Sequence, residues 1–273
     1  MRATTDAEEA LDGADVVVLA VPSQTLRQNL SAVARAIPSE AVLVSLMKGV
    51  ELGTTKRMSE VIREVADVPS DRVVVVTGPN LAKEIAAEQP TASVVASTSA
   101  DAATEVQRLS HTPYFRPYTN TDVIGCELGG AVKNVIALAV GMADGMGFGD
   151  NTKASLITRG LKEITALGVA LGADPVTFSG LAGLGDLVAT CSSSLSRNHR
   201  FGARLGQGDS VEVILAEPHL TAEGYKSCQS ILALGTKHDV EMPITENVVN
   251  VCHDGMAPVD MLRALMGREA GSE

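Results

Sequence analysis

Asp15-Val16-Val17-Val18-Leu19-Ala20-Val21 is a short, continuous apolar run that ends at Pro22-Ser23. A run of this length and composition is typical of a strand buried on both faces of a parallel sheet. Further strand-like runs are expected at residues 41–46, 72–76, 92–96 and 114–118. Helical stretches are expected between strands at residues 24–37, 55–66 and 101–109. Strands that alternate with helices in this way predict βαβ units and a parallel sheet.

The pattern changes beyond about Thr121, where helical periodicity continues to the end of the chain. Asp122 is a suitable cap for a long helix that runs to about Met142, and Asn151 or Thr152 is suited to cap the next one. We therefore predict an α/β domain over residues 1–120 and an all-helical domain over residues 121–273.

Composition excludes several classes of function. The chain has 33 acidic and 22 basic residues, a net charge of −11, which argues against a nucleic-acid partner and against docking on anionic membranes. Since no run reaches the roughly 18 consecutive apolar residues of a spanning helix, we expect no membrane insertion. The four cysteines lie far apart without a CxxC pair, and the histidines form no metal-ligand spacing. Reduced thiols, no metal and a cytoplasmic location are therefore expected.

Three loops follow predicted strands and would lie together at the carboxyl edge of the sheet, where ligands bind in such folds. They contain Pro22-Ser23-Gln24, Met47-Lys48-Gly49 and Thr77-Gly78-Pro79-Asn80. Each loop by itself is equally well explained as an ordinary turn, since Gly, Pro and Asn are common in turns. Three in succession favour a binding site.

Lys133 lies in the middle of a helix of small and apolar residues, Gly129 to Ala139. Burial disfavours the ammonium form and lowers the pKa of a lysine, so this residue is suited to proton transfer. Gly129 and Gly130 keep one face of the helix narrow, so that a ligand could approach the amine, and Asn134 offers a donor and an acceptor to a polyol. The alternative is a lysine that extends from a helix end to water.

Ser196-Arg197-Asn198 stands at a second candidate site. Ser196 is a good cap for a short helix that ends near Gly206, and amide groups at a helix start bind phosphate. Arg197 adds a bidentate donor for the same group. Taken alone, a capped helix with a surface arginine is the simpler interpretation.

Together these segments resemble the NAD(P)-dependent glycerol-3-phosphate dehydrogenases of the bacterial biosynthetic type. The matching pieces occur in family order along the whole chain: Ala20-Val21-Pro22-Ser23-Gln24, Lys48-Gly49-Val50-Glu51, Gly78-Pro79-Asn80, Ala131-Val132-Lys133-Asn134-Val135-Ile136-Ala137, Gly149-Asp150-Asn151-Thr152-Lys153, Gly185-Asp186-Leu187, Ser196-Arg197-Asn198 and Glu223-Gly224-Tyr225.

The resemblance implies reversible conversion of dihydroxyacetone phosphate to sn-glycerol 3-phosphate with NAD or NADP, which supplies phospholipid synthesis. Lys133 would be the general acid/base that protonates the nascent alkoxide. By the same likeness the other substrate residues would be Lys48, Gly78, Asn80, Asp186, Ser196, Arg197 and Asn198. The coenzyme residues would be Lys48, Ala82, Arg197, Thr221 and Glu223. Asn80 stands where the family often has serine, and either side chain can form hydrogen bonds.

The chain departs from the family pattern at its start. The family opens with a strand, a G-x-G-x-x-G turn and a helix, and this sequence contains no such turn. We expect that at least one βαβ unit of roughly 30 residues is missing and that coenzyme binding is weak without it. A homodimer is a candidate assembly.

Two other interpretations stay open at this point. A related dehydrogenase of a 3-hydroxy acid or sugar acid would also carry a helix-borne lysine followed by asparagine. A catalytically dead fragment whose helical half serves as an oligomerisation module would explain the absent turn. The Ser196-Arg197-Asn198 and Gly185-Asp186-Leu187 segments favour the triose phosphate over the first alternative.

Overall fold

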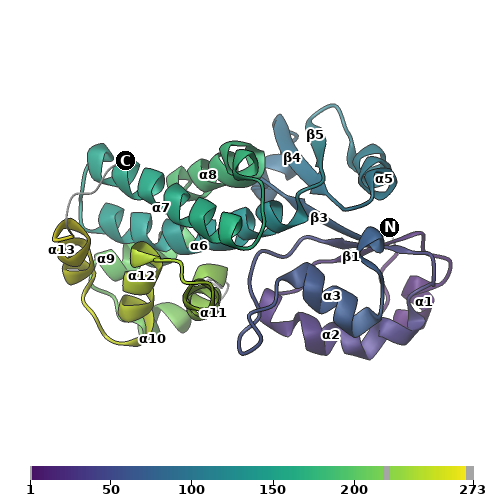
Figure 1. Ribbon diagram of the computed structural model, residues 1–273, viewed down its shortest axis with the longest axis horizontal. Helices are drawn as coiled ribbons and strands as arrows, with labels where there is room; N and C mark the ends of the chain where they lie inside the picture. The colour runs from purple at the N-terminus through teal and green to yellow at the C-terminus, as the bar shows by residue number, and fades with distance from the viewer. Residues whose placement is uncertain (1, 218–221, 269–273) are drawn as a thin grey trace.

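The strands of the protein form one five-stranded sheet in the first half of the chain (Figure 1). The computed structural model describes residues 2–217 and 222–268. The strands are β1 (Val16–Leu19), β2 (Val42–Ser45), β3 (Val73–Thr77), β4 (Thr91–Ala96) and β5 (Phe115–Asn120). They lie side by side in sequence order.

The pairing is parallel from β1 to β3 and again between β4 and β5, whereas β4 runs antiparallel to β3. The connection between β3 and β4 contains only the one-turn helix α4 (Ala82–Ala86) instead of a helical crossover, so the chain returns in the opposite direction. The expected α/β class is therefore confirmed: the sheet is Rossmann-like, with one antiparallel pair that the sequence did not predict.

Helices cover both faces of the sheet. The elements of this half are α1 (Ala7–Leu11), η1 (Ser23–Thr25), α2 (Leu26–Val33), η2 (Ala34–Ala36), α3 (Met58–Ala66), η3 (Ser70–Arg72) and α5 (Ala100–Ser110). On one face α2 and α3 bury Leu26 and Ile62 against Leu43 of β2. On the other face α5 buries Val106 against Val74 of β3. Burial of every β3 side chain explains its continuous apolar run.

The second half is helical, and none of its described residues forms a strand. Its elements are α6 (Val123–Gly145), α7 (Asp150–Ala170), η4 (Pro175–Ser179), η5 (Leu181–Gly185), α8 (Asp186–Ser192), α9 (Arg197–Gly206), α10 (Val211–Leu215), α11 (Glu223–Lys237), α12 (Pro243–His253) and α13 (Pro258–Met266). Asp122 caps α6 and Ser196 caps α9, as expected. The start of α7 differs from the prediction, because Gly149, rather than Asn151 or Thr152, is its N-cap.

Helix α6 runs through the middle of the helical half and reaches the sheet (Figure 1). It is long and apolar enough to cross a membrane, but 89% of its apolar window is buried inside the protein. The packing of α9 against it is unusually close. A Cβ atom on Gly141 of α6 or on Gly202 of α9 would collide with the backbone of the other helix. Helix α6 is therefore the core helix of this half, and it holds Lys133 near the sheet.

Candidate active site

Three charged side chains from distant parts of the sequence converge between the sheet and the helical half. Lys133 Nζ donates to Asp186 Oδ1 at 2.5 Å, and Lys48 Nζ donates to Asp186 Oδ2 at 2.7 Å. One carboxylate thus bridges two ammonium groups, and the cluster has a net charge of one positive unit. A localised positive site of this kind is suited to an anionic substrate in an otherwise acidic molecule.

Each member of the cluster is held by a different element. Lys48 follows β2, Lys133 lies in the middle of α6, and Asp186 is the first residue of α8. The π-helical turn η5 comes directly before Asp186. Turns of this type are rare in proteins, and those that occur often lie at functional sites.

The glycines before Lys133 have a different role from the one expected. A Cβ atom on Gly129 would collide with the carbonyl oxygen of Ala182 in η5, and one on Gly130 would lie 2.7 Å from Thr77 Oγ1. The space beside these two glycines is therefore occupied by the protein itself. The missing side chains let η5 and the end of β3 pack against α6. Close packing brings Asp186 and Lys48 to Lys133, whereas the sequence suggested that the gap would admit a ligand.

Lys133 is nearly inaccessible, with 5% of its surface exposed. Besides Asp186, its Nζ donates to Thr190 Oγ1 at 2.6 Å. Burial, followed by the charge of Lys48, lowers the pKa of Lys133 to about 8, while Asp186 acts in the opposite direction. Since an ammonium group has three hydrogens and two are engaged here, one remains for a ligand oxygen. The amine can therefore both give and take a proton near neutral pH.

The loop after β3 adds acceptors to the same region. Gly78 has φ +111°, and its carbonyl oxygen accepts from Lys48 Nζ at 2.8 Å. Thr77 Oγ1 and Asn80 Oδ1 are buried without a hydrogen-bond partner among the described residues. Because buried polar atoms are normally paired, these two oxygens are candidates to form hydrogen bonds with a ligand.

A chain of amides links the helices beside the cluster. Asn198 Nδ2 donates to Asn134 Oδ1 at 2.9 Å, and the Gly224 amide at the start of α11 donates to Asn198 Oδ1 at 2.9 Å. Asn134 Nδ2 faces the carbonyl oxygens of Lys48 and Gly130, both at 3.4 Å. Asn134 is therefore engaged with the protein, which differs from its expected contact with a polyol. Much of the Asn198 side chain is engaged as well.

The residues expected to hold phosphate begin α9. The Ser196 hydroxyl accepts from the amide of His199 at 3.2 Å and caps the helix. Ser196 is buried and Arg197 is exposed, so the guanidinium is accessible to a ligand at the helix start. These residues reach the lysine cluster through Asn198 and Asn134 rather than by direct contact.

The expected coenzyme residues lie around the Lys48 loop. Glu223 Oε2 accepts from the Ser23 hydroxyl at 2.6 Å, and Ser23 packs directly against Gly49. Ala82 is exposed at the first position of α4, just after the β3 loop. Thr221 lies outside the described residues.

Thr190 was not predicted as a site residue, and Thr77 and Ser23 were selected only as members of loops. Thr190 stands four positions after Asp186 on α8, so both lie on one helix face, and this spacing is a signal that could have been used. Thr77 and Ser23 belong to loops that had been selected, yet nothing in the sequence distinguished them from their neighbours.

The residues that are present fit one part of a dinucleotide site, without the G-x-G-x-x-G turn that the sequence does not contain. The loops after β1, β2 and β3 meet at the carboxyl edge of the parallel strands, where such coenzymes bind. The unpartnered oxygen of Asn80 supplies an acceptor there, and Lys48 supplies positive charge. Among the described residues, no group of three or more His, Cys, Asp or Glu is placed to hold a metal ion.

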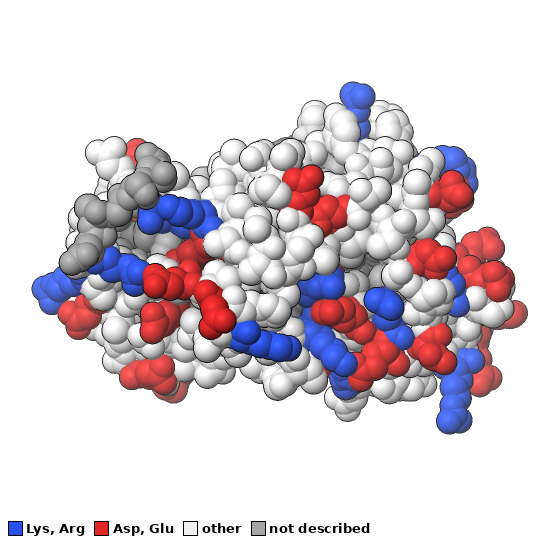
Figure 2. All heavy atoms as spheres, in the orientation of Figure 1, with Lys and Arg blue, Asp and Glu red and all other residues white. Residues whose placement is uncertain are grey.

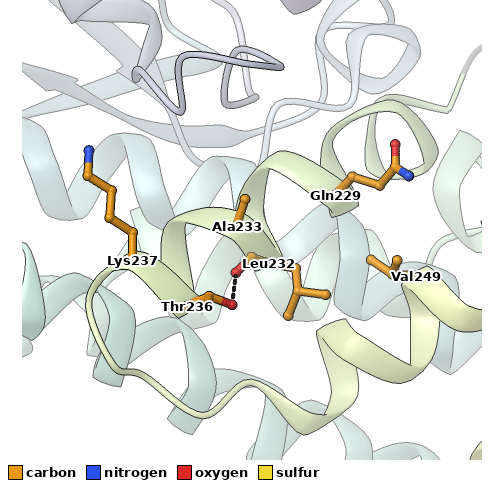
Figure 3. Close-up of a pocket in the computed structure, with 6 residues that line it drawn as sticks. All are labelled: Gln229, Leu232, Ala233, Thr236, Lys237 and Val249. Carbon is orange, nitrogen blue, oxygen red and sulfur yellow. Dashed lines mark hydrogen bonds between the residues drawn. The ribbon is translucent and has the colours of Figure 1, made fainter.

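The outer surface of the molecule shows no second concentration of the expected site residues among the described residues. Acidic and basic side chains are interspersed over the face shown in Figure 2. An open hollow of about 490 Å³ lies on the helical half, between α11 and α12 (Figure 3). Its lining is mostly apolar and contains none of the expected site residues: Gln229, Leu232, Ala233, Thr236, Lys237 and Val249. The charged cluster is therefore the better candidate for chemistry.

Comparison with known proteins gives consistent matches along the chain. Residues 1–103 match the family model described as NAD-dependent glycerol-3-phosphate dehydrogenase N-terminus, and residues 122–263 match the corresponding C-terminus model. A glycerol-3-phosphate dehydrogenase (NAD(P)+) of Streptomyces griseus is 64% identical over all 273 residues, which cover 81% of its length. The enzyme of the same name from Thermobifida fusca is 61% identical, also over 81% of its length.

A solved structure agrees with this result. The crystal structure of glycerol-3-phosphate dehydrogenase from Coxiella burnetii superposes with a TM-score of 0.89 at 35% identity, covering 96% of this chain and 80% of that one.

Proposed function

The chain belongs to the NAD-dependent glycerol-3-phosphate dehydrogenase family, and we propose that the cluster of Lys48, Lys133 and Asp186 performs the acid–base chemistry of its reaction. The enzyme is an oxidoreductase that interconverts sn-glycerol 3-phosphate and dihydroxyacetone phosphate with NAD(P)(H). We propose that it supplies glycerol 3-phosphate for phospholipid synthesis.

Lys133 gives and takes the proton. When bound, the coenzyme would supply the hydride for the carbonyl carbon. As negative charge develops on the carbonyl oxygen, Lys133 donates a proton to it, and in the reverse direction its neutral amine accepts the proton of the hydroxyl group. A pKa of about 8 allows both forms to be populated at physiological pH.

Asp186 and Lys48 orient the proton donor and stabilise charge. The carboxylate fixes the Lys133 amine at 2.5 Å and fixes Lys48 at 2.7 Å, so neither side chain needs to reorganise during the reaction. Preorganised charge at a developing oxyanion is a large term in catalysis of this kind. Lys48 would thus contact the substrate and the coenzyme from the sheet side.

The remaining residues would bind the two ends of the ligands. Arg197, with Ser196 and Asn198 at the start of α9, would hold the phosphate, and Arg197 would also contact the coenzyme. Gly78 and Asn80 would line the substrate. Ala82, Thr221 and Glu223 would contact the coenzyme. The hydrogen bond between Ser23 and Glu223 supports this proposal, because it places Glu223 beside the Lys48 loop.

We further propose separate roles for the two domains, a cellular location and an oligomeric state. Residues 1–120 would hold the coenzyme, and residues 121–273 would hold the substrate and the catalytic lysine. The enzyme would work in the cytoplasm, since its four cysteines are buried free thiols, and it would assemble as a homodimer.

The single observation that carries the proposal is the buried Lys133–Asp186–Lys48 arrangement. Lys133→Met removes the proton donor but keeps the length and the apolar stem of the side chain. We expect kcat to fall by about two to four orders of magnitude, the usual range for general acid–base catalysis. Steady-state kinetics in both directions measure this, with coenzyme affinity from fluorescence titration as the control that should change little.

Turnover of Lys133→Met within about threefold of the parent would remove Lys133 from this role, because it lies far outside that range. Full coenzyme binding by a parent enzyme that shows no turnover would favour the oligomerisation module over a catalyst.

A further inference from the structure

A second charged cluster links the two halves of the molecule away from the reacting groups. Glu127 belongs to α6 and is 7% exposed. Its side chain packs against the first turn of α3, which belongs to the sheet half. Its Oε1 accepts from the Ser59 amide at 2.8 Å. Its Oε2 accepts from the Ser59 hydroxyl at 2.5 Å and from Arg57 Nη1 at 2.6 Å. Both carboxylate oxygens are therefore occupied by donors from the other half.

The position of this carboxylate is electrostatically favourable. Arg57 is the N-cap of α3 and Ser59 is its second residue, so Glu127 caps that helix from outside. A negative charge at a helix N-terminus is stabilised by the exposed amides and by the helix dipole. Because the group is buried, breaking one side of this pair would leave an uncompensated charge, which is costly.

Arg57 is connected to Lys48 through one hairpin loop, residues 46–57. The loop is closed by the antiparallel bridge between Val50 and Arg57 and by the Glu51 amide, which donates to the Lys56 carbonyl at 2.9 Å. Lys48 comes two residues before Val50. A displacement of Arg57 relative to α6 would therefore carry Lys48 with it.

Glu127 is connected to Lys133 in the same way. Both lie on α6, six residues apart, which corresponds to about 9 Å along a helix axis. The hairpin and the helix thus each carry one residue of the link, Arg57 or Glu127, and one lysine of the active site.

We propose that Glu127 is a positioning residue that fixes the hairpin of residues 46–57 against α6 and thereby sets the separation of Lys48 and Lys133 around Asp186. This inference rests on the proposed role of Lys133. It goes further by assigning control of the lysine pair to a residue that does not touch the reacting atoms.

The proposal has a specific electrostatic consequence. The charged groups that act on the pKa of Lys133 are Lys48 from the hairpin and Asp186 from α8. The Cys191 thiol of α8 also faces this amine, since the charge of Lys133 lowers the pKa of that thiol. Lys48 lowers the pKa of Lys133, so a hairpin that moves away from α6 lets this pKa rise. Glycerol 3-phosphate oxidation needs the neutral amine, and its rising pH limb should then move to higher pH.

The test is Glu127→Gln, which keeps the shape and removes the charge. We expect kcat to fall roughly 10- to 100-fold, as for a small misplacement of reacting groups. The pH limb of kcat should shift upward by roughly 0.5 to 1 unit, a part of what a like charge at 4–6 Å produces. Arg57→Met removes one of three donors and should give a smaller shift in the same direction, and it also serves if Glu127→Gln does not fold.

The matched control is Glu163→Gln. Glu163 of α7 is also buried and accepts from the Ile244 amide at 2.5 Å and the Thr245 amide at 3.2 Å at the start of α12. Burial raises the pKa of Glu163 to about 7, so this variant also controls for the loss of a buried carboxyl that titrates within the range of the assay. The cap lies wholly within the helical half, so its loss should leave the pH limb unmoved. Equal losses of activity in the two variants with unshifted limbs would overturn the positioning role.

Two readouts do not need turnover. Hydrogen exchange of the Ser59 amide reports the link itself, and an NMR titration of the lysine-labelled protein, with Lys133→Met to assign the signal, gives the pKa of the buried Lys133 amine. Faster exchange at Ser59 with a raised Lys133 pKa in Glu127→Gln supports the proposal even if Lys133→Met retains activity and the catalytic role fails. Faster exchange with an unchanged pKa overturns it.

Discussion

Asp186 holds two ammonium groups at once, so its charge controls the protonation of Lys133. Removing the carboxylate by Asp186→Asn takes away the one strong influence that raises the pKa of Lys133. We expect that pKa to fall below about 8. Oxidation of glycerol 3-phosphate needs the neutral amine, so its rising pH limb should move to lower pH. Reduction of dihydroxyacetone phosphate needs the ammonium form, so the falling limb of its pH profile should also move to lower pH.

The measurement is kcat against pH for oxidation and for reduction. In Lys48→Met the pH limbs should shift in the opposite direction to those of Asp186→Asn. Lys48 lowers the pKa of Lys133, so its removal should move both limbs to higher pH. Limbs that move in the same direction in the two variants would show that Lys133 is not the titrating group.

Arg197 is the second residue with a testable role. Arg197→Ala should weaken the binding of dihydroxyacetone phosphate by roughly 1.5–3 kcal/mol, the scale of a hydrogen bond to a charged group. Unphosphorylated dihydroxyacetone should be nearly unaffected, since it lacks the partner. Arg200→Ala, another exposed arginine of α9, is the control that should leave both substrates unchanged. Equal losses for both substrates would contradict a phosphate contact.

Single residues could be predicted where their chemistry conflicts with their surroundings. A lysine among Gly, Ala and Val residues indicated burial and a lowered pKa, and both are present. The partners of Lys133 could not be found in this way, because Asp186 is 53 positions distant and its approach depends on how η5 packs against Gly129. The same holds for Glu127, whose donors come from a different half of the molecule.

At the scale of elements, the contact between α6 and α9 depends on residues without side chains. Gly202→Ala would place a methyl group against the Leu138 carbonyl oxygen of α6. Since backbone must then shift, we expect a loss of about 1–3 kcal/mol in the free energy of unfolding, as for other overpacked sites. Chemical denaturation measures this. Gly149→Ala is the control, because its added methyl group meets no atom within 4 Å and only the N-cap preference of glycine over alanine at the start of α7 is lost, at most about 1 kcal/mol.

The elements themselves were largely predictable. Each of the five expected strands overlaps an observed one, and the match is clearest for β3, where burial of every side chain requires a continuous apolar run. The expectation that residues 15–21 form a strand buried on both faces was wrong, because β1 is only partly buried, as is β5. The reversal at β4 was missed, since the run Thr91–Ala96 has the same composition in either direction and only the short α4 connection decides it. The start of α7 was missed because Gly149 caps the helix without a side chain.

At the scale of the whole molecule, the sheet ends at an open strand. Among the described strands, β1 pairs only with β2, and Val18 on it is 54% exposed. An apolar edge with unpaired amide and carbonyl groups favours association with another chain. We expect the 273-residue chain to self-associate as its concentration rises, and Val18→Lys to reduce this. Sedimentation velocity measures the effect.

Val176→Lys is the control, because Val176 is 72% exposed but lies in η4, away from the sheet. A single monomeric mass at all concentrations would contradict association through β1, and so would equal effects of the two substitutions.

The π-helical turn before Asp186 limits which insertions and deletions the gene can tolerate at this point. A turn of this kind accommodates a surplus residue, so the spacing from Gly180 to Asp186 is one that ordinary α-helical winding does not provide. Loss of a single codon there would change the winding of this first turn and move Asp186 by about 100° about the helix axis. The carboxylate would then no longer bridge the two lysines, and activity would be lost. Length at η5 is therefore expected to be held constant through evolution, while loops elsewhere are free to grow and shrink.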